Sequence, residues 1–308
     1  MIRILTDSTS SIPPQLRSDL GIDTISLHVN YNGQEFEEAT MDLDAFYADI
    51  YDMKNNPPTS SQPSPAATSA YLEEAAAAGD QVIATCLSSR MSGTFESVVS
   101  IAAQVKERHP QFTYAVIDST TNCMELGLPV IAGARQRNQG ATFDQCVATI
   151  RDAIHSTRFL FAPESLKFLE AGGRIGKAAA LLGSLVKISP VLTVKDGAAE
   201  TFAKVRTYKK ALDKIVEAYR ADTEGLGRAG AEALGLTDLA VHYIGSRTPA
   251  EQWARDVIEP LVGRSVLVTP ASPVIGVHVG PAMGIAWQCA RPIPGKFEAI
   301  VPEVVVSA

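Results

Sequence analysis

Residues 81–108, QVIATCLSSRMSGTFESVVSIAAQVKER, contain the clearest sign of the fold class. The apolar run 81–87 predicts a buried strand, and the spacing of apolar residues over 95–108 predicts a helix. Further buried strands are predicted at 2–6 and 112–117. Strands that alternate with helices are typical of a parallel sheet that is covered on both faces.

Helices predicted at 66–78 and 125–135 continue this alternation. The sequence 22–37 predicts a hairpin, because Asn32-Gly33 supplies the positive φ angles of a tight turn. Residues 55–65, NNPPTSSQPSP, contain four prolines and four hydroxyl side chains, which predicts a loop without regular structure. A domain linker is one interpretation of this loop. A loop over a sheet edge agrees better with its place inside the alternating pattern.

The second half of the chain begins with a predicted strand at 158–163. The elements predicted after it are helices at 164–170, at 177–186, from residue 208 and at 249–261, a hairpin over 188–205, and strands at 239–243 and 265–268. We therefore predict an α/β fold of two domains. Residues 1–157 form an N-terminal domain with a mostly parallel sheet flanked by helices, and residues 158–308 form a C-terminal domain with a mixed sheet.

The composition of the 308 residues is that of a folded chain, since 46% are hydrophobic and 20% are charged. With 27 basic and 34 acidic residues the net charge is −7, which argues against a general nucleic-acid-binding protein. The four cysteines lie far apart, so neither a zinc site nor a disulfide framework is predicted. The longest apolar run, 178–186, is too short to span a membrane, and 1–7 is too short for a signal peptide. We expect a cytoplasmic protein without stable membrane insertion.

Common cofactor and hydrolase motifs are missing or stand in the wrong context. Residues 225–230 match the spacing G-x-G-x-x-G, but they follow a predicted helix rather than a strand, so a glycine turn at the helix C-terminus is favoured. Gly176-Lys177 lacks the first glycine and the Ser or Thr of a P-loop. The motifs G-x-S-x-G and H-E-x-x-H are absent. We expect neither a cofactor nor a metal.

Each of the three strands predicted in the first half ends in a turn rich in hydroxyl side chains. The turns are DSTSS at 7–11, SSRMSGT at 88–94 and DSTT at 118–121. The carboxyl ends of parallel strands share one edge of a sheet, and ligands bind there. Hydroxyls and the free N–H groups of helix N-termini at one edge suit an anionic head group.

Helix capping is the competing explanation, because Ser, Thr and Asp are the preferred N-cap residues. Three turns in register, together with the hydroxyls of 59–64, make a ligand site an equal alternative. Asp7 and Asp118 are expected to anchor loops, since a bare carboxylate would repel a bound anion.

Six short motifs occur in order along the chain, and together they resemble the bacterial DegV family. They are TDST at 6–9, SSQPS at 60–64, SGT at 92–94, IDS at 117–119, GGRI at 172–175 and HVGP at 278–281. Each motif alone is weak, but the six in order cover nearly the whole chain.

The resemblance implies a fatty-acid-binding protein of two α/β domains, with the acyl chain buried between them. It also implies a carrier rather than an enzyme, because family members present the bound fatty acid to a separate fatty acid kinase that makes acyl-phosphate. The positions implied to hold the carboxylate are Ser60, Ser92, Gly93 and His278. The secondary or partner-facing positions are Ser61, Arg174 and Arg206.

Two positions depart from the family pattern. The usual Thr is Ser60 here, which keeps the hydroxyl but loses the methyl that restricts the rotamer. The family's H-x-G-P-G ends in Ala282, which would be strained if that position requires a positive φ angle.

Two other functions remain open on the residues alone. The hydroxyl-rich turns could belong to an enzyme that acts on a small anionic substrate, with Ser92 as nucleophile and His278 as its base. A histidine could instead capture a substrate covalently. Each site residue also has a structural alternative, which is capping for Ser92, a serine turn for Ser60 and a core position for His278.

The remaining histidines, His28, His109, His155 and His242, are expected to be structural or exposed. The lining of an acyl pocket is not readable from the pattern. Candidates, for which core packing is the better interpretation, are Met91, Phe95, Phe168, Leu169, Leu182, Leu185 and Ile275.

Overall fold

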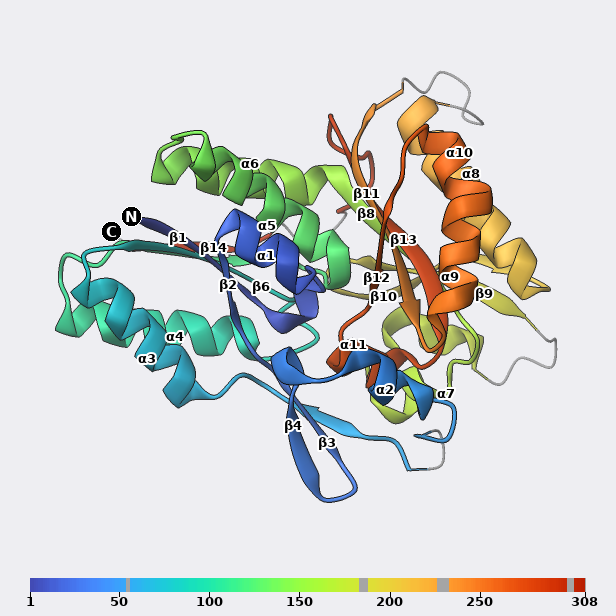
Figure 1. Cartoon of the computed structure of the whole chain (residues 1–308), viewed down its shortest axis with the longest axis horizontal. Helices are drawn as coiled ribbons and strands as arrows, with labels where there is room; N and C mark the ends of the chain where they lie inside the picture. The colour runs from blue at the N-terminus through green and yellow to red at the C-terminus, as the bar shows by residue number, and fades with distance from the viewer. Residues whose placement is uncertain (54–55, 183–187, 226–232, 298–301, 308) are drawn as a thin grey trace.

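The computed structural model describes the chain except for residues 54–55, 183–187, 226–232, 298–301 and 308. Its described part forms two main sheets, each with its own helices, and a smaller third sheet (Figure 1). The predicted α/β class, with one mostly parallel and one mixed sheet, is confirmed.

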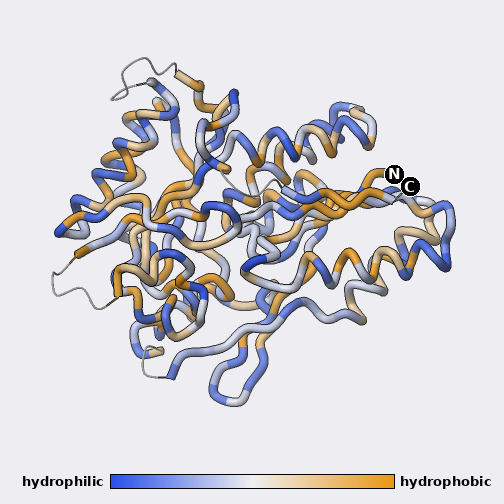
Figure 2. The backbone as a smooth tube through the Cα atoms, turned by 180° about the vertical axis from the view of Figure 1, so that it is seen from behind, coloured by the Kyte–Doolittle hydropathy of each residue, from blue (hydrophilic) through white to orange (hydrophobic). Residues whose placement is uncertain are grey.

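The first sheet has the strand order β14-β7-β6-β1-β2, with β14 antiparallel to β7 and the other strands parallel. Its strands are β1 Ile2–Asp7, β2 Ile22–Ile25, β6 Gln81–Cys86, β7 Tyr114–Asp118 and β14 Val304–Val306. These strands appear as hydrophobic segments beside the two chain ends in Figure 2. They are apolar because helices cover both faces of the sheet.

One face of the first sheet packs against α3 and α4, and the opposite face packs against α5 and α6 (Figure 1). The helices of this half are α1 Pro14–Leu20, α2 Leu43–Ala48, α3 Pro65–Ala77, α4 Thr94–Arg108, α5 Cys123–Asn138 and α6 Phe143–Ser156. Helix α5 also contacts β8 and β13 of the second sheet. It therefore joins the two main sheets into one core.

The second sheet has the strand order β10-β9-β8-β13-β11-β12, in which the β11–β12 pair is parallel and the others antiparallel. Its strands are β8 Thr157–Pro163, β9 Ser189–Lys195, β10 Ala198–Val205, β11 Leu236–Ile244, β12 Leu267–Pro270 and β13 Ala282–Cys289. Its helices are α7 Lys167–Ala171, α8 Tyr208–Glu224, α9 Arg247–Trp253, α10 Glu259–Val262 and α11 Pro273–Val279. Helices α8 and α9 cover the face opposite to α5.

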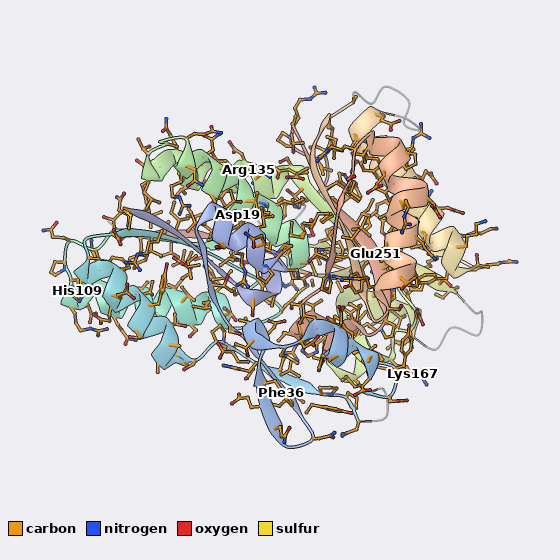
Figure 3. All side chains as sticks on the ribbon, in the orientation of Figure 1. Asp19, Phe36, His109, Arg135, Lys167 and Glu251 are labelled. Carbon is orange, nitrogen blue, oxygen red and sulfur yellow. The ribbon has the colours of Figure 1, made fainter. Side chains whose placement is uncertain are left out.

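The third sheet, β4-β3-β5, corrects two predictions. Its strands are β3 His28–Tyr31, β4 Gln34–Glu37 and β5 Thr59–Ser61. The hairpin begins at β3 rather than at residue 22, because 22–25 is β2 of the first sheet. The stretch 55–65 contains β5, although we expected no regular structure, because a three-residue strand fits between flanking prolines at a sheet edge. Phe36, labelled in Figure 3, lies on the projecting β3–β4 hairpin.

Two predicted helices differ from the structure. In place of the α-helix predicted at 177–186 the structure has a 3₁₀ helix, Gly176–Leu181, and residues 183–187 are outside the described part. The prediction at 249–261 is interrupted by a π-helical turn, Ala254–Ile258, between α9 and α10. Further 3₁₀ turns are Ser8–Ser10 and Glu38–Thr40.

The glycine at the end of α8 has the expected helix-ending role, since Gly225 adopts a left-handed conformation with φ +71°. The rest of that motif, 226–232, lies outside the described residues. The division at residue 157 stays a prediction, and β14 lies with the first sheet rather than the second. Among the described residues, no helix combines the length and the apolar composition that a membrane crossing requires.

Candidate functional site

The hydroxyl-rich turns meet at the carboxyl edge of the first sheet, and two buried carboxylates hold them together. Asp7 accepts a hydrogen bond from Leu87 N at 2.6 Å, which ties the first turn to the second. Asp118 accepts from Thr120 N at 2.7 Å and from Ser89 N at 3.3 Å, which ties the third turn to the second. Burial raises the pKa of Asp7 to about 6. Both aspartates therefore anchor loops, as the sequence predicted.

Beside this edge lies a cavity of about 610 Å³, which we call the first cavity. Residues of the second main sheet, of the third sheet and of the turns that follow β6 and β7 line it, so it lies between the carboxyl edge of the first sheet and the second sheet. Its volume is within the range of about 300–1,000 Å³ that is usual for small-molecule sites. Its apolar side chains include Leu87, Met91, Phe159, Phe161, Leu169 and Ile275. All positions that the resemblance singled out line it except Arg206: they are Ser60, Ser61, Ser92, Gly93, Arg174 and His278.

Ser60 reaches the cavity from the short strand β5, where it pairs with Val29 of β3. Its hydroxyl oxygen lies 2.8 Å from Nε2 of His278, which is 218 residues further along the chain. This contact joins the proline-flanked segment to the last turn of α11.

Helix α11 positions His278, and neighbouring segments fix the ends of that helix. At its start Ser272 is the N-cap and Pro273 occupies the first turn, where a missing N–H costs nothing. The Tyr47 hydroxyl donates to the carbonyl oxygens of Ala271 and Ser272. The position of the histidine therefore depends on contacts that α2 makes at the opposite end of α11.

Two glycines allow the close packing around His278. A Cβ atom at Gly172 would lie 2.3 Å from His278 Nδ1. Gly280 has φ +71°, and a Cβ atom there would lie 2.3 Å from Phe168. The lack of space therefore requires glycine at both motif positions, and the positive φ angle is a second reason at Gly280. Ala282 begins β13 and is not among the described residues with positive φ, so the strain considered for it is absent.

His278 is neutral near pH 7. Burial, with a smaller contribution from the nearby charge of Arg174, lowers its pKa to about 4. Its Nδ1 is buried and has no hydrogen-bond partner among the described residues. If Nε2 carries the proton and donates to Ser60, the Ser60 O–H is free to donate to a ligand. The pair can then present one hydroxyl donor to a carboxylate.

Ser92 and Gly93 lie where the second turn enters α4. The Ser92 hydroxyl lies 2.9 Å from Thr94 Oγ1 and accepts from Thr94 N at 3.3 Å, so it satisfies the first N–H of α4, although Gly93 is the N-cap residue. A Cβ atom at Gly93 would lie 2.7 Å from Nε2 of Gln62, so glycine here lets the segment 60–64 pack against the turn. Among the described contacts, Ser92 makes no hydrogen bond to His278, and the serine that contacts this histidine is Ser60. The nucleophile–base pair of the enzyme alternative is not assembled.

The secondary positions divide into two groups. Arg174 is exposed and donates to the carbonyl oxygen of Gly172 at 2.7 Å, beside His278. Ser61 contacts Glu35 at 3.4 Å. Arg206 is exposed between β10 and α8, outside the cavity lining. Its placement gives no support to a role at the head group, and its partner-facing role stays a prediction.

His242 of β11 also lines the first cavity, and no pattern in the sequence indicates this. Its Nε2 accepts from Met124 N at 3.0 Å, so Nδ1 carries the proton and donates to Thr269 O at 3.1 Å. Burial lowers its pKa to about 4. The expected structural role of His242 agrees with these contacts.

Phe159 and Phe161 are further lining residues that the sequence analysis missed. Their two-residue spacing puts both rings on one face of β8, and this spacing could have identified them. Of the acyl-lining candidates, Met91, Leu169 and Ile275 line the cavity, Phe95, Phe168 and Leu182 do not, and Leu185 is outside the described residues. Within the described ranges, no cluster of three or more His, Cys, Asp or Glu side chains could hold a metal ion.

Comparisons with known proteins identify the relatives of this chain. A family model described as "Uncharacterised protein, DegV family" matches residues 1–289. The DegV domain-containing protein CA_C3284 of Clostridium acetobutylicum is 35% identical over 291 residues, which cover 94% of this chain and 98% of that protein. A solved structure described as DegV, a fatty acid binding protein from Bacillus subtilis, is 29% identical with a TM-score of 0.80, covering 94% of this chain and 99% of that one. A structure described as fatty acid binding of a DegV family protein from Thermus thermophilus is 28% identical with a TM-score of 0.78 and the same two coverages.

Proposed function

The chain belongs to the DegV family, and from this premise we propose that it binds a long-chain fatty acid in the first cavity. One observation carries the proposal: Ser60, Ser92 and His278 come from three separate segments and line one apolar cavity. The fatty acid binding described for the Bacillus and Thermus structures supports it.

The acyl chain supplies most of the binding free energy in this proposal. Burial of about fourteen methylenes contributes about 11 kcal/mol at most, from which the lost freedom of the ligand subtracts several kcal/mol. The carboxylate then sets the orientation. Ser60 and Ser92 donate hydrogen bonds to it, and the N-terminus of α4 adds a favourable dipole. The exposed guanidinium of Arg174 beside His278 adds positive charge.

Lipid extraction from the purified protein, followed by mass spectrometry, tests the proposal. We expect about one fatty acid per chain, and saturable binding of added oleate or palmitate after delipidation. A protein that yields no fatty acid and binds neither probe would contradict the proposed function.

The finer part of the proposal is that the protein is a carrier without catalytic groups of its own, which presents the carboxyl end of the ligand to a separate fatty acid kinase. Arg206 belongs to the docking face in this view, because it is exposed and lies outside the cavity lining. We expect Arg206→Ala to slow acyl-phosphate formation by the kinase while oleate affinity stays unchanged. Arg220→Ala, at an exposed arginine of α8, is the charge-matched control. A loss of oleate affinity without a loss of phosphorylation rate would show that the assignment of Arg206 is wrong.

A further inference from the structure

A second cavity of about 370 Å³ lies at the start of α11. Ser272 and Pro273 line this second cavity, whereas Ile275 and His278 of the same helix line the first. Its other walls are the turn after β1, helix α1, Thr24 of β2, the segment 38–44, Arg247 of α9 and strand β12, so it lies between the two main sheets. Asp19, labelled in Figure 3, marks α1. We propose that the second cavity binds a small molecule through an oxyanion group, a carboxylate or a phosphate, which Arg17 holds.

Arg17 is the first observation behind this proposal. Its Nε atom is buried and has no hydrogen-bond partner, and the described residues provide no ion pair for its guanidinium. Burial lowers the pKa of Arg17, and the charge of Glu38 partly opposes this effect. A guanidinium offers five N–H donors in a planar fork that matches two oxygens of a carboxylate or a phosphate. An oxyanion would therefore satisfy a donor that the chain leaves unsatisfied.

Two hydroxyl groups in the lining of the second cavity are a second observation behind this proposal. Thr24 Oγ1 is buried without a partner in the described part of the chain, and Thr24 lines the same cavity. Ser10, also in the lining, is 1% exposed, and its hydroxyl makes none of the hydrogen bonds found among the described residues. Buried polar groups normally have partners, so unsatisfied groups gathered in one cavity need an explanation. A ligand that accepts hydrogen bonds provides one.

The carboxylates of the second cavity do not make it a cation site. Glu38 accepts from the Ser8 hydroxyl and from Val274 N, so both its oxygens are engaged, and burial raises its pKa to about 7. Asp42 caps α2 by accepting a backbone N–H at 3.1 Å. Asp44 Oδ2 lies 3.8 Å from Nη1 of Arg247 in α9. The buried carboxylate is thus fully engaged and the other two are exposed, while buried donors remain free, which favours an anionic rather than a cationic occupant.

Calorimetric titration of the intact protein with inorganic phosphate and, separately, with acetate tests the site. We expect saturable binding of at least one probe with a Kd of about 1 mM or tighter, and the better probe identifies the oxyanion class. Arg17→Gln should weaken that binding at least about tenfold. Arg255→Gln, at an exposed arginine outside the cavity, is the charge-matched control and should bind as the wild type does.

Thr24→Val keeps the size of the side chain and removes only the hydroxyl, so it carries the test if Arg17→Gln does not fold. It should weaken binding about threefold or more. Because neither Arg17 nor Thr24 lines the first cavity, a loss in these variants locates the anion in the second. Absence of saturable binding for both probes, or equal affinity in wild type and both variants, would overturn the proposal.

Discussion

His242 is buried and His278 is partly buried in the lining of the first cavity, and they differ in what their ring nitrogens contact. His242 uses both nitrogens, one for Met124 N and the other for Thr269 O. His278 uses one nitrogen, for Ser60, and its other nitrogen has no partner among the described residues. Burial lowers the pKa of both to about 4. Burial and a shifted pKa are therefore common to both histidines, and the contacts of the ring are what distinguish the proposed binding histidine from the structural one.

The two environments explain the difference. His242 lies within β11, and strands β12 and β13 pair with β11 on its two sides. His278 lies in the last turn of a seven-residue helix, where α11 meets β5 and α7. The His242 ring therefore packs within a sheet. The His278 ring lies where segments that are distant in sequence meet at a cavity.

Replacement of the structural histidine should have the largest effect. We expect His242→Leu to lower the free energy of unfolding by about 3 kcal/mol, because Met124 N and Thr269 O lose their partners inside the core. Urea unfolding followed by circular dichroism measures this. A loss below about 1 kcal/mol would show that His242 is not the structural member of the pair.

Replacement of His278, the proposed binding histidine, should act on the ligand instead. We expect His278→Ala to weaken oleate binding by about 2 kcal/mol, or about 30-fold, because the contact that orients the Ser60 hydroxyl is lost. Unfolding stability should change by less than about 1 kcal/mol, since one ring nitrogen already lacks a partner. Displacement of a fluorescent fatty acid reports the affinity. Full affinity with reduced stability would reverse the roles assigned to the two histidines.

The pH dependence of stability can separate the two rings. Each is neutral when folded and regains a pKa near 6.5 on unfolding, so the unfolded state binds more protons between pH 4 and 6.5. Their contribution to stability is therefore lost as pH falls through this window. Removing either ring should make the stability curve shallower by about 1.4 kcal/mol per pH unit.

This pH effect has to be measured as a difference between wild type and variant. Burial raises the pKa of Asp7 to about 6 and of Glu38 to about 7, so the folded state holds extra protons on these groups and their contribution is lost as pH rises. Bound oleate should reduce the slope that belongs to His278, because a nearby carboxylate favours its protonated form. The slope of His242 should not respond. An equal response of both rings would remove the distinction between them.

The smallest effect is expected at the capping serine of the site. Ser92→Ala should weaken oleate binding by about 1 kcal/mol, because Thr94 Oγ1 competes for the same hydroxyl in the free protein. Affinity is measured by the same displacement assay, with Ser89→Ala, outside the cavity lining, as the control. Unchanged affinity together with reduced stability would leave Ser92 with the capping role alone.

The sequence predicts the buried parallel strands well because their apolar runs stand between polar turns. It does not predict α11, whose residues PVIGVHV are nearly all buried and show no helical alternation of apolar and polar residues. It also misses β5, because prolines surround the three residues that pair with β3. Both elements carry a central site residue. The motifs thus identify Ser60 and His278, but the contact between them depends on tertiary structure across 218 residues.

Strand β14 has a consequence for the way the chain is made. Residues 304–306 cover the outer edge of β7 in a sheet whose other strands end by residue 118. β7 ends at residue 118 and β14 begins at residue 304. During translation the edge of β7 is therefore uncovered until nearly two hundred further residues have left the ribosome. An uncovered edge strand is a template for pairing with other chains. The nascent protein consequently carries an uncovered strand edge throughout that interval, in which chaperones that bind the growing chain would act most usefully.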